Sequence, residues 1–399
     1  MQETTSPSPT LRLPVGLAFF CFVLIGTNDG VNGVLLPSLN AFYAVGYAVL
    51  GLLFFVSSFG YFLSAISSGF LTQRLGLRGI LLLGATAFLI GILPFGLKVP
   101  FVLLFPARLV FGLSVGLLET GLNIYITTRP RSTLILNYLH AFYGVGALIG
   151  PATATIILAL QWGWNSVYLL LGGVDLLLLI GFGIFARPIQ SARLEEKAST
   201  TENVLSVTLK LPVVWLITFF LLVYVGIEVS LGNWAYSFLL GSRHIAPFLA
   251  GWIVTGYWSG LTVGRFLLQN IAERLGLGTK GLIYLCICLV GVSLALIWLI
   301  PLEFIAIIAL FLIGFGLGPI YPLTIDITPK LVPAHLGASA IGVLVSVSII
   351  GLAVFPWLAG VLAQFVGIWT LLPYSLILTL VMLVLWRVLV VAASDSSKL

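Results

Sequence analysis

The stretch "RPIQSARLEEKASTTENVLSVTLK", from Arg187 to Lys210, is the longest polar segment in an otherwise apolar chain of 399 residues. Of these residues, 60% are hydrophobic and only 8% are charged. A soluble domain carries about 25% charged residues, so this chain has far more apolar side chains than a soluble interior can hold. The composition predicts an all-α membrane protein that the polar segment divides into two parts.

Apolar runs on both sides of this segment predict twelve membrane-spanning helices, six in each part. Each run has about 20 residues or more, which is enough for one crossing of a bilayer. The predicted spans are 15–39, 47–72, 79–97, 101–126, 133–160, 164–186, 211–239, 247–271, 279–299, 303–326, 335–365 and 368–391. The predicted domains are a tail at 1–14, six-helix halves at 15–186 and 211–391, a linker at 187–210 and a tail at 392–399.

The Lys and Arg residues predict the orientation of these spans. Fourteen of the eighteen fall on the side that carries both termini, Lys98 and Arg243 fall on the other side, and Arg108 and Arg265 lie within spans. Cytoplasmic loops carry an excess of positive charge, so both termini are expected in the cytoplasm. The net charge of +6 is therefore a topology signal, and no nucleic-acid partner is predicted. We expect a multi-pass protein of the plasma membrane, which in a bacterium is the inner membrane.

The two halves echo each other at an offset of 200 residues. "RLGL" occurs at Arg74–Leu77 and again at Arg274–Leu277, in each case after the second span of its half. Gly26 and Gly60 recur in the same way as Gly226 and Gly260. Such repetition indicates duplication, and two parallel six-helix repeats with a site between them are typical of secondary transporters.

Two stretches of the first half resemble signatures of the major facilitator superfamily. "GFLTQRLGLRG" (Gly69–Gly79) resembles the signature of the loop between the second and third spans, although Gln73 replaces the usual Asp. "RLVFGLSVG" (Arg108–Gly116) resembles the signature of the fourth span. The resemblance covers nearly the whole chain and implies the fold of this superfamily, with two six-helix halves.

Three further stretches are similar to the fucose:proton symporter family, especially its glucose/mannose-type bacterial members. They are "NDGVNGVLLP" (Asn28–Pro37), "LETGLNIY" (Leu118–Tyr125) and "LNYLHAFYGVGALIGP" (Leu136–Pro151). In that family an Asp of the first span and a Glu of the fourth are implicated in proton coupling. The resemblance places these roles on Asp29 and Glu119. A fifth-span Gln of the fucose-type pattern is His140 here, so the sugar is expected to differ.

The carboxyls of Asp29 and Glu119 stand in apolar segments, which suits proton carriers. A charge at the bilayer centre costs about 2.5–3.5 kcal/mol on insertion scales, and a carboxyl avoids much of this cost by taking up a proton. The alternative is a structural carboxyl that forms hydrogen bonds between helices. Asp175 has no polar companion within a helical turn, and the sequence leaves both roles open for it. Asp326 is expected to be a structural charge near a loop.

Helical spacing brings Arg108 into the candidate proton-coupling group with Asp29 and Glu119. At about 100° per residue, Arg108, Glu119 and Asn123 fall with two glycines within a stripe of about 80°. The glycines allow close approach of a neighbouring helix, and the stripe then faces the bundle interior. In the alternative, the glycines serve packing only and Arg108 reaches for the outer headgroups.

A substrate with apolar C–H faces and a polar rim, such as a sugar, fits the remaining polar and aromatic residues of the spans. The candidate substrate-binding residues are Asn28, Asn32, Asn123, Asn137, His140, Tyr224, Glu228, Trp234, Tyr257, Trp258 and Tyr321. For each aromatic residue, helix packing or an interfacial anchor is an equal alternative. His140 is expected to titrate near neutral pH, to bind a sugar hydroxyl, or to be a satisfied neutral histidine. Arg265 is a candidate partner of Glu228.

These features predict a proton-coupled symporter of a monosaccharide, a hexose such as glucose, mannose or fucose, that works by alternating access. We expect no enzyme activity, cofactor or metal, and a monomer whose partners are the sugar, protons and the lipid bilayer. The alternative is a proton-coupled antiporter that exports a drug-like or other small metabolite, because "GALIGP" (Gly146–Pro151) contains part of an antiporter signature. A third possibility is a transport-inactive receptor or scaffold.

Overall fold

The computed structural model describes residues 12–127, 129, 131–185, 201–274 and 276–394. Most of these residues are helical, as the composition predicts. Most of the predicted linker, the tail before Arg12 and the tail after Ser394 lie outside the described residues, so the predicted boundaries there stay predictions.

In the described part of the first half, five α-helices cover the six predicted spans. They are α1 (Arg12–Tyr43), α2 (Tyr47–Gly96), α3 (Leu104–Thr127), α4 (Ser132–Ala159) and α5 (Asn165–Phe185). The 50-residue α2 covers both the second and the third predicted span. Gly76 interrupts it with φ 66° and ψ 172°, a conformation that glycine adopts without steric cost. The turn predicted between the two spans is therefore a sharp break in a nearly continuous helix.

The second half begins after the short helix α6 (Thr201–Leu209), which packs against α7 and α12. Its helices are α7 (Pro212–Gly241), α8 (Pro247–Arg274), α9 (Thr279–Leu299), α10 (Glu303–Leu317), α11 (Ile320–Leu331), α12 (Gly337–Phe365) and α13 (Leu371–Ser394). The tenth predicted span is broken between α10 and α11, where Gly318 and Pro319 stand.

The helices agree with a protein that crosses a membrane many times. Among the described residues, ten helical segments are long and apolar enough to span a bilayer. One of them is α2, which covers two predicted spans, and α8 covers the eighth predicted span although it is not one of the ten. Each of the twelve predicted spans thus coincides with helix.

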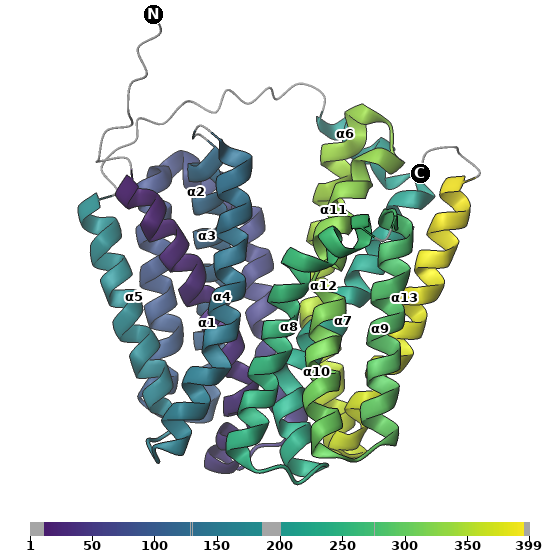
Figure 1. Ribbon diagram of the computed structural model, residues 1–399. Coiled ribbons are helices and arrows are strands. Elements are labelled where there is room, and N and C mark those ends of the chain that lie inside the picture. The colour runs from purple at the N-terminus through teal and green to yellow at the C-terminus, as the bar shows by residue number, and fades with distance from the viewer. Residues whose placement is uncertain (1–11, 128, 130, 186–200, 275, 395–399) are drawn as a thin grey trace, which may run out of the picture.

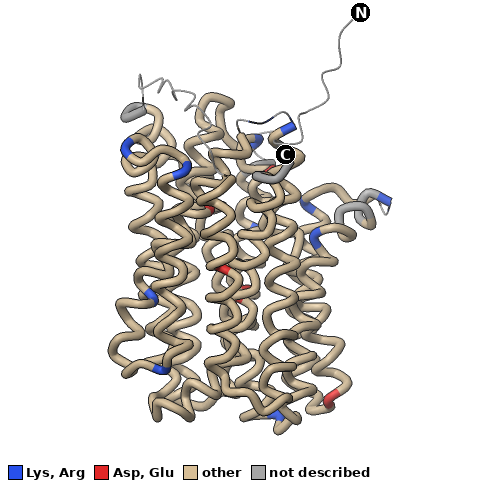
Figure 2. The backbone as a smooth tube through the Cα atoms, turned by 90° about the vertical axis from the view of Figure 1, so that its left-hand side faces the viewer, with Lys and Arg blue, Asp and Glu red and all other residues tan. Residues whose placement is uncertain are grey.

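The two halves stand side by side as separate bundles (Figure 1), and the described chain begins and ends at the same end of the molecule. Close helix packing within each half depends on glycine. A Cβ on Gly26 would strike the carbonyl of Tyr143, and one on Gly146 would strike the carbonyl of Val23. Because these two glycines have no side chain, the backbones of α1 and α4 lie in direct contact. Figure 2 shows most of the Lys and Arg positions at the end that carries the termini.

The halves contact each other at the end opposite the termini. A Cβ on Gly33 of α1 would strike the backbone carbonyl of Gly232 in α7. The backbone N–H of Ala48, at the start of α2, donates a hydrogen bond to Oε1 of Gln364, at the end of α12, over 2.8 Å. The indole of Trp234 is fully buried at this interface, where its ring contacts those of Tyr47 and Phe54 in α2, while its N–H donates to the carbonyl of Pro356 within its own half over 2.8 Å. The molecule is therefore closed between its halves at this end.

The α1–α4 packing predicts a site-specific loss of stability. Gly146→Ala places a methyl group against the backbone of Val23, which has no side-chain freedom to relax, and overpacking of this kind costs about 1–3 kcal/mol. Gly173→Ala is the matched control, because nothing lies within 4 Å of its added Cβ. Thermal unfolding of the two purified variants in detergent should show a lower midpoint for Gly146→Ala alone. Equal midpoints would contradict the packing described here.

Candidate functional site

A cavity of about 220 Å³, lined by apolar side chains together with charged and polar ones, lies between the two halves. A water molecule occupies about 30 Å³ in the liquid, so the space is far larger than one water. Most of its wall comes from α1, α2, α3 and α4 of the first half, and the rest from α7, α8 and α12. The lining residues are Asp29, Asn32, Phe54, Ser57, Ser58, Tyr61, Arg108, Phe111, Gly112, Val115, Glu119, Tyr143, Val229, Asn233, Trp258 and Leu352.

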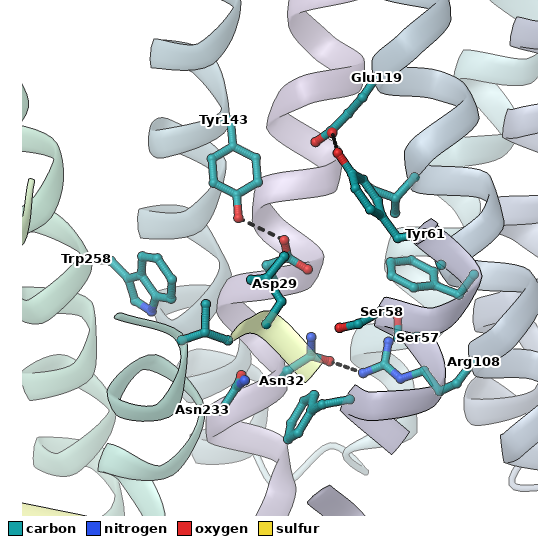
Figure 3. Close-up of a pocket in the computed structure, with 16 residues that line it drawn as sticks. Asp29, Asn32, Ser57, Ser58, Tyr61, Arg108, Glu119, Tyr143, Asn233 and Trp258 are labelled. Atoms are coloured by element: carbon teal, nitrogen blue, oxygen red, sulfur yellow. Dashed lines mark hydrogen bonds between the residues drawn. The ribbon is translucent and has the colours of Figure 1, made fainter. Parts of the chain in front are cut away.

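The carboxyl of Asp29 in α1 is held by a tyrosine from α4 (Figure 3). The hydroxyl of Tyr143 donates to Oδ2 of Asp29 over 2.8 Å, and the side-chain amide of Asn28 lies 3.5 Å from Oδ1. This geometry follows from the local packing, because Gly26 lets the Tyr143 backbone approach α1. The close helix contact thus sets the distance between the phenol and the carboxyl.

The carboxyl of Glu119 in α3 is held in the same way by α2. The hydroxyl of Tyr61 donates to Oε2 of Glu119 over 2.7 Å. A Cβ on Gly112 would strike the carbonyl of Ser57, and one on Gly116 would strike the hydroxyl of Ser64. The glycine stripe predicted for the fourth span therefore packs against α2, and it brings Tyr61 within reach of Glu119.

Arg108 carries a positive charge in the wall of the same cavity. It is only 4% exposed, and its Nη2 donates to Oδ1 of Asn32 over 2.6 Å. Its guanidinium lies 5.1 Å from the ring centroid of Phe95 and 5.2 Å from that of Phe111. The alternative in which Arg108 reaches for headgroups is wrong, because the side chain is buried and bonded to α1. Aromatic faces and one amide partner stabilise this cation.

A pair of opposite charges lies in the other half. Nη2 of Arg265 in α8 lies 3.5 Å from Oε1 of Glu228 in α7, as the sequence suggested. The hydroxyl of Tyr257 donates to the backbone carbonyl of Glu228 over 2.9 Å, and the rings of Tyr224 and Tyr321 lie 6.4 Å apart. These side chains do not line the 220 Å³ cavity, and they form a separate polar cluster.

The structure brings together part of the predicted site. Asp29, Asn32, Arg108, Glu119 and Trp258 line the cavity. The other predicted residues lie outside its wall: Asn28, Asn123, Asn137, His140, Tyr224, Glu228, Trp234, Tyr257 and Tyr321. Their proposed roles in binding stay predictions.

Three of these residues lie in settings that differ from a cavity wall. Trp234 belongs to the closed interface between the halves, where its ring contacts those of Tyr47 and Phe54. Asn137 and His140 are exposed in the part of α4 nearer the termini, and the His140 ring meets the edge of Phe22 with centroids 5.4 Å apart. The structure thus places His140 about one helical turn from Tyr143, outside the cavity wall.

Several cavity residues were missed by sequence reasoning. Tyr61 and Tyr143 are the hydrogen-bond donors to the two carboxyls, and Ser57, Ser58 and Asn233 complete the polar wall. A signal was present for Tyr143, which stands three residues after His140 and so shares much of its helical face. Nothing in the sequence pairs Tyr61 with Glu119, because these residues are 58 positions apart.

Two helical halves with a cavity between them are typical of secondary membrane transporters. Comparison with known families agrees, because the model of the Major Facilitator Superfamily matches residues 18–242 and again 229–398. The chain therefore belongs to the Major Facilitator Superfamily. It is a multi-pass membrane protein of a transporter family, and it is not an enzyme.

Similar proteins span nearly the same length. "Bypass of stop codon protein 6" of Saccharomyces cerevisiae is 27% identical over 90% of this chain and 79% of its own. A glucose/mannose transporter of Bacillus subtilis is 20% identical over 80% of both chains. A glucose/galactose transporter of Brucella abortus is 24% identical over 87% of both. The crystal structure of a D-xylose-proton symporter matches the fold with a TM-score of 0.80 and 14% identity, over 94% of this chain and 97% of that one.

The Arg108–Asn32 contact yields a prediction about stability. Asn32→Ala removes the acceptor of a charged hydrogen bond and leaves a buried guanidinium without it, which should cost about 1.5–3 kcal/mol. Asn40→Ala is the control, because its amide bonds a backbone carbonyl, that of Val45, in a neutral contact. Thermal unfolding in detergent should show the larger loss for Asn32→Ala. A larger loss for Asn40→Ala would refute the assignment.

Proposed function

We propose that this protein is a proton-coupled symporter of a monosaccharide and that it works by alternating access. The observation that carries the proposal is the pairing of two carboxyls with two tyrosines in one cavity wall. Asp29 and Glu119 each accept a hydrogen bond from a phenol of a neighbouring helix, and both face the same space as Arg108. Such carboxyls are suited to take up and release a proton as the cavity changes its access to water.

The cavity wall suits a sugar. Asn32, Asn233, Ser57 and Ser58 offer amides and hydroxyls to a polar rim, and the Trp258 ring offers a flat apolar surface (Figure 3). Two relatives are named as transporters of glucose with mannose or galactose. We therefore expect a neutral hexose such as glucose, mannose or fucose as the substrate.

A proton gradient supplies enough free energy for accumulation. One proton that enters down a potential of about 100 mV releases about 2.3 kcal/mol. Each pH unit adds about 1.4 kcal/mol. In the proposed cycle, a carboxyl takes up the proton from outside, the sugar binds between the halves, and the halves then rock to release both inside.

The proposed orientation places both termini in the cytoplasm. Lys and Arg residues gather at the end that carries the termini, as the positive-inside rule requires of a cytoplasmic face. The halves are closed at the opposite end by the Gly33–Gly232 approach and the Ala48–Gln364 hydrogen bond. In this orientation the described state is closed to the outside. The proposed location is the plasma membrane.

Sugar uptake into proteoliposomes with an imposed proton gradient tests the proposal. The wild-type protein should concentrate a radiolabelled hexose, and a protonophore should abolish the accumulation. Asp29→Asn and Glu119→Gln keep the size of each side chain but remove its proton exchange, so at least one of them should abolish accumulation. Asp326→Asn is the control, because Asp326 pairs with Lys330 on the surface, where an ion pair contributes about 0–1 kcal/mol.

The same assay separates the competing functions. Normal accumulation by both Asp29→Asn and Glu119→Gln would refute the coupling role of these carboxyls. Proton-driven efflux of lipophilic cations without sugar uptake would identify an antiporter instead. The structure gives "GALIGP" another use, because Gly146 and Gly150 lie against the α1 backbone at Val23 and Thr27. Hexose binding without any flux would identify a receptor.

A further inference from the structure

Arg265 joins three segments of the second half. From α8, its Nη2 lies 3.5 Å from Oε1 of Glu228 in α7, and its Nε donates to the carbonyl of Gly318 over 3.3 Å. Gly318 stands in the break between α10 and α11. The side chains of Arg265 and Glu228 are 25% and 13% exposed, so both are partly accessible. The neutralised cation thus bridges a carboxylate and a helix break.

The Gly318 carbonyl that Arg265 binds lacks its i+4 helical N–H donor because of a proline. In a continuous α-helix the carbonyl of residue 318 accepts the N–H of residue 322. Residue 322 is Pro322, which has no N–H, so that hydrogen bond cannot form. Pro319 removes the partner of the Phe315 carbonyl in the same way. The sequence "GPIYP" therefore creates the acceptor, and Arg265 satisfies it from a neighbouring helix.

Close packing holds Arg265 at this place. A Cβ on Gly264 would strike the carbonyl of Phe315, and a Cβ on Gly318 would strike the carbonyl of Leu261. The two glycines let the α8 backbone lie directly against the break. The Tyr257 hydroxyl donates to the backbone carbonyl of Glu228, which anchors the main chain of α7 while its carboxylate stays free to change partners.

We propose that Arg265 is a positioning residue that links the carboxylate of Glu228 to the break between α10 and α11. A ligand that binds Glu228 would then change the backbone hydrogen bonding at that break, and this effect of a ligand rests on the proposed transport function. The Nη2–Oε1 distance of 3.5 Å is longer than a charge-assisted hydrogen bond, and Val229, next to Glu228, lines the cavity, so a sugar hydroxyl that reaches Glu228 can compete with Arg265 for it. Hinges of moving domains lie at the ends of helices, which is where Arg265 binds.

Hydrogen–deuterium exchange of the full-length protein in lipid nanodiscs, measured without a ligand, tests the link from Glu228 through Arg265 to Gly318. Arg265→Gln should speed exchange of the backbone in residues 314–326 roughly tenfold, because a hydrogen bond to a charged group is lost. Arg265→Lys keeps a charge beside Glu228 but loses the planar Nε donor, so it should show the same direction. Glu228→Gln should also speed exchange there, because Arg265 loses its ionic partner.

Pro322→Ala is the decisive variant, because it supplies a backbone N–H for the Gly318 carbonyl. In its background, Arg265→Gln should change exchange in residues 314–326 by less than about twofold, since the helix now satisfies that carbonyl. Pro329→Ala is the control, because Pro329 is also an exposed proline inside α11 and lies well away from Gly318 in sequence. In that background the effect of Arg265→Gln should remain in full.

The outcomes separate this inference from the proposed function. The link through Arg265 is refuted if Arg265→Gln leaves ligand-free exchange within about twofold of wild type, or if Pro322→Ala does not suppress the effect of Arg265→Gln.

The effect of a ligand is tested with glucose, mannose and fucose in turn. A hexose that protects residues 24–36 around Asp29 should also change exchange at 314–326 in wild type but not in Arg265→Gln. Protection at 24–36 with no change at 314–326 refutes ligand sensing. No protection by any hexose refutes the sugar proposal, and the ligand-free comparison of wild type with Arg265→Gln still tests the link through Arg265.

Discussion

Charged side chains inside this protein have no bulk water to bind, and Arg108, Glu228 and Arg265 find their partners on neighbouring helices. In an apolar environment an unpaired charge is costly, so charged side chains pair across helices. Arg108 bonds Asn32 and so links α3 to α1, while Glu228 and Arg265 link α7 to α8. These links join helices that otherwise contact each other little, whereas α2 packs extensively on α3, and α12 on α7.

Glycine makes these polar contacts possible. A hydrogen bond of 2.8 Å between Tyr143 and Asp29 needs the two helix axes to lie close together, and Gly26 removes the side chain that would keep them apart. The same relation holds for Gly112, Gly116 and the Tyr61–Glu119 contact. Small residues at helix interfaces are typical of membrane proteins because van der Waals packing replaces the hydrophobic effect there. Here the same residues also set the geometry of the carboxyls.

The two halves share a fold but carry different chemistry. The first half contributes both cavity carboxyls, their phenol partners and Arg108, whereas the second half contributes Trp258, Asn233 and the separate Arg265–Glu228 pair. The tenth span is the least regular helix of the second half, because two prolines remove the N–H groups that would bond Phe315 and Gly318. The protonatable site and the broken helix thus lie in different halves, the two bodies that alternating access would move relative to each other.

The sequence by itself determined the class of the protein and the places of its helices. Apolar length and charge spacing are local properties, so a helical membrane protein of two repeats and its family were predictable, and so were Asp29, Arg108 and Glu119 as unusual polar residues. The tertiary structure alone decided what those residues touch. Tyr61 meets Glu119 across 58 positions and Tyr143 meets Asp29 across 114. Such pairs depend on helix rotation and close approach, which no local pattern encodes. The sequence likewise left sugar binding and helix packing as equal alternatives for Trp234. The tertiary structure places its ring in the interface that closes the halves, against Tyr47 and Phe54.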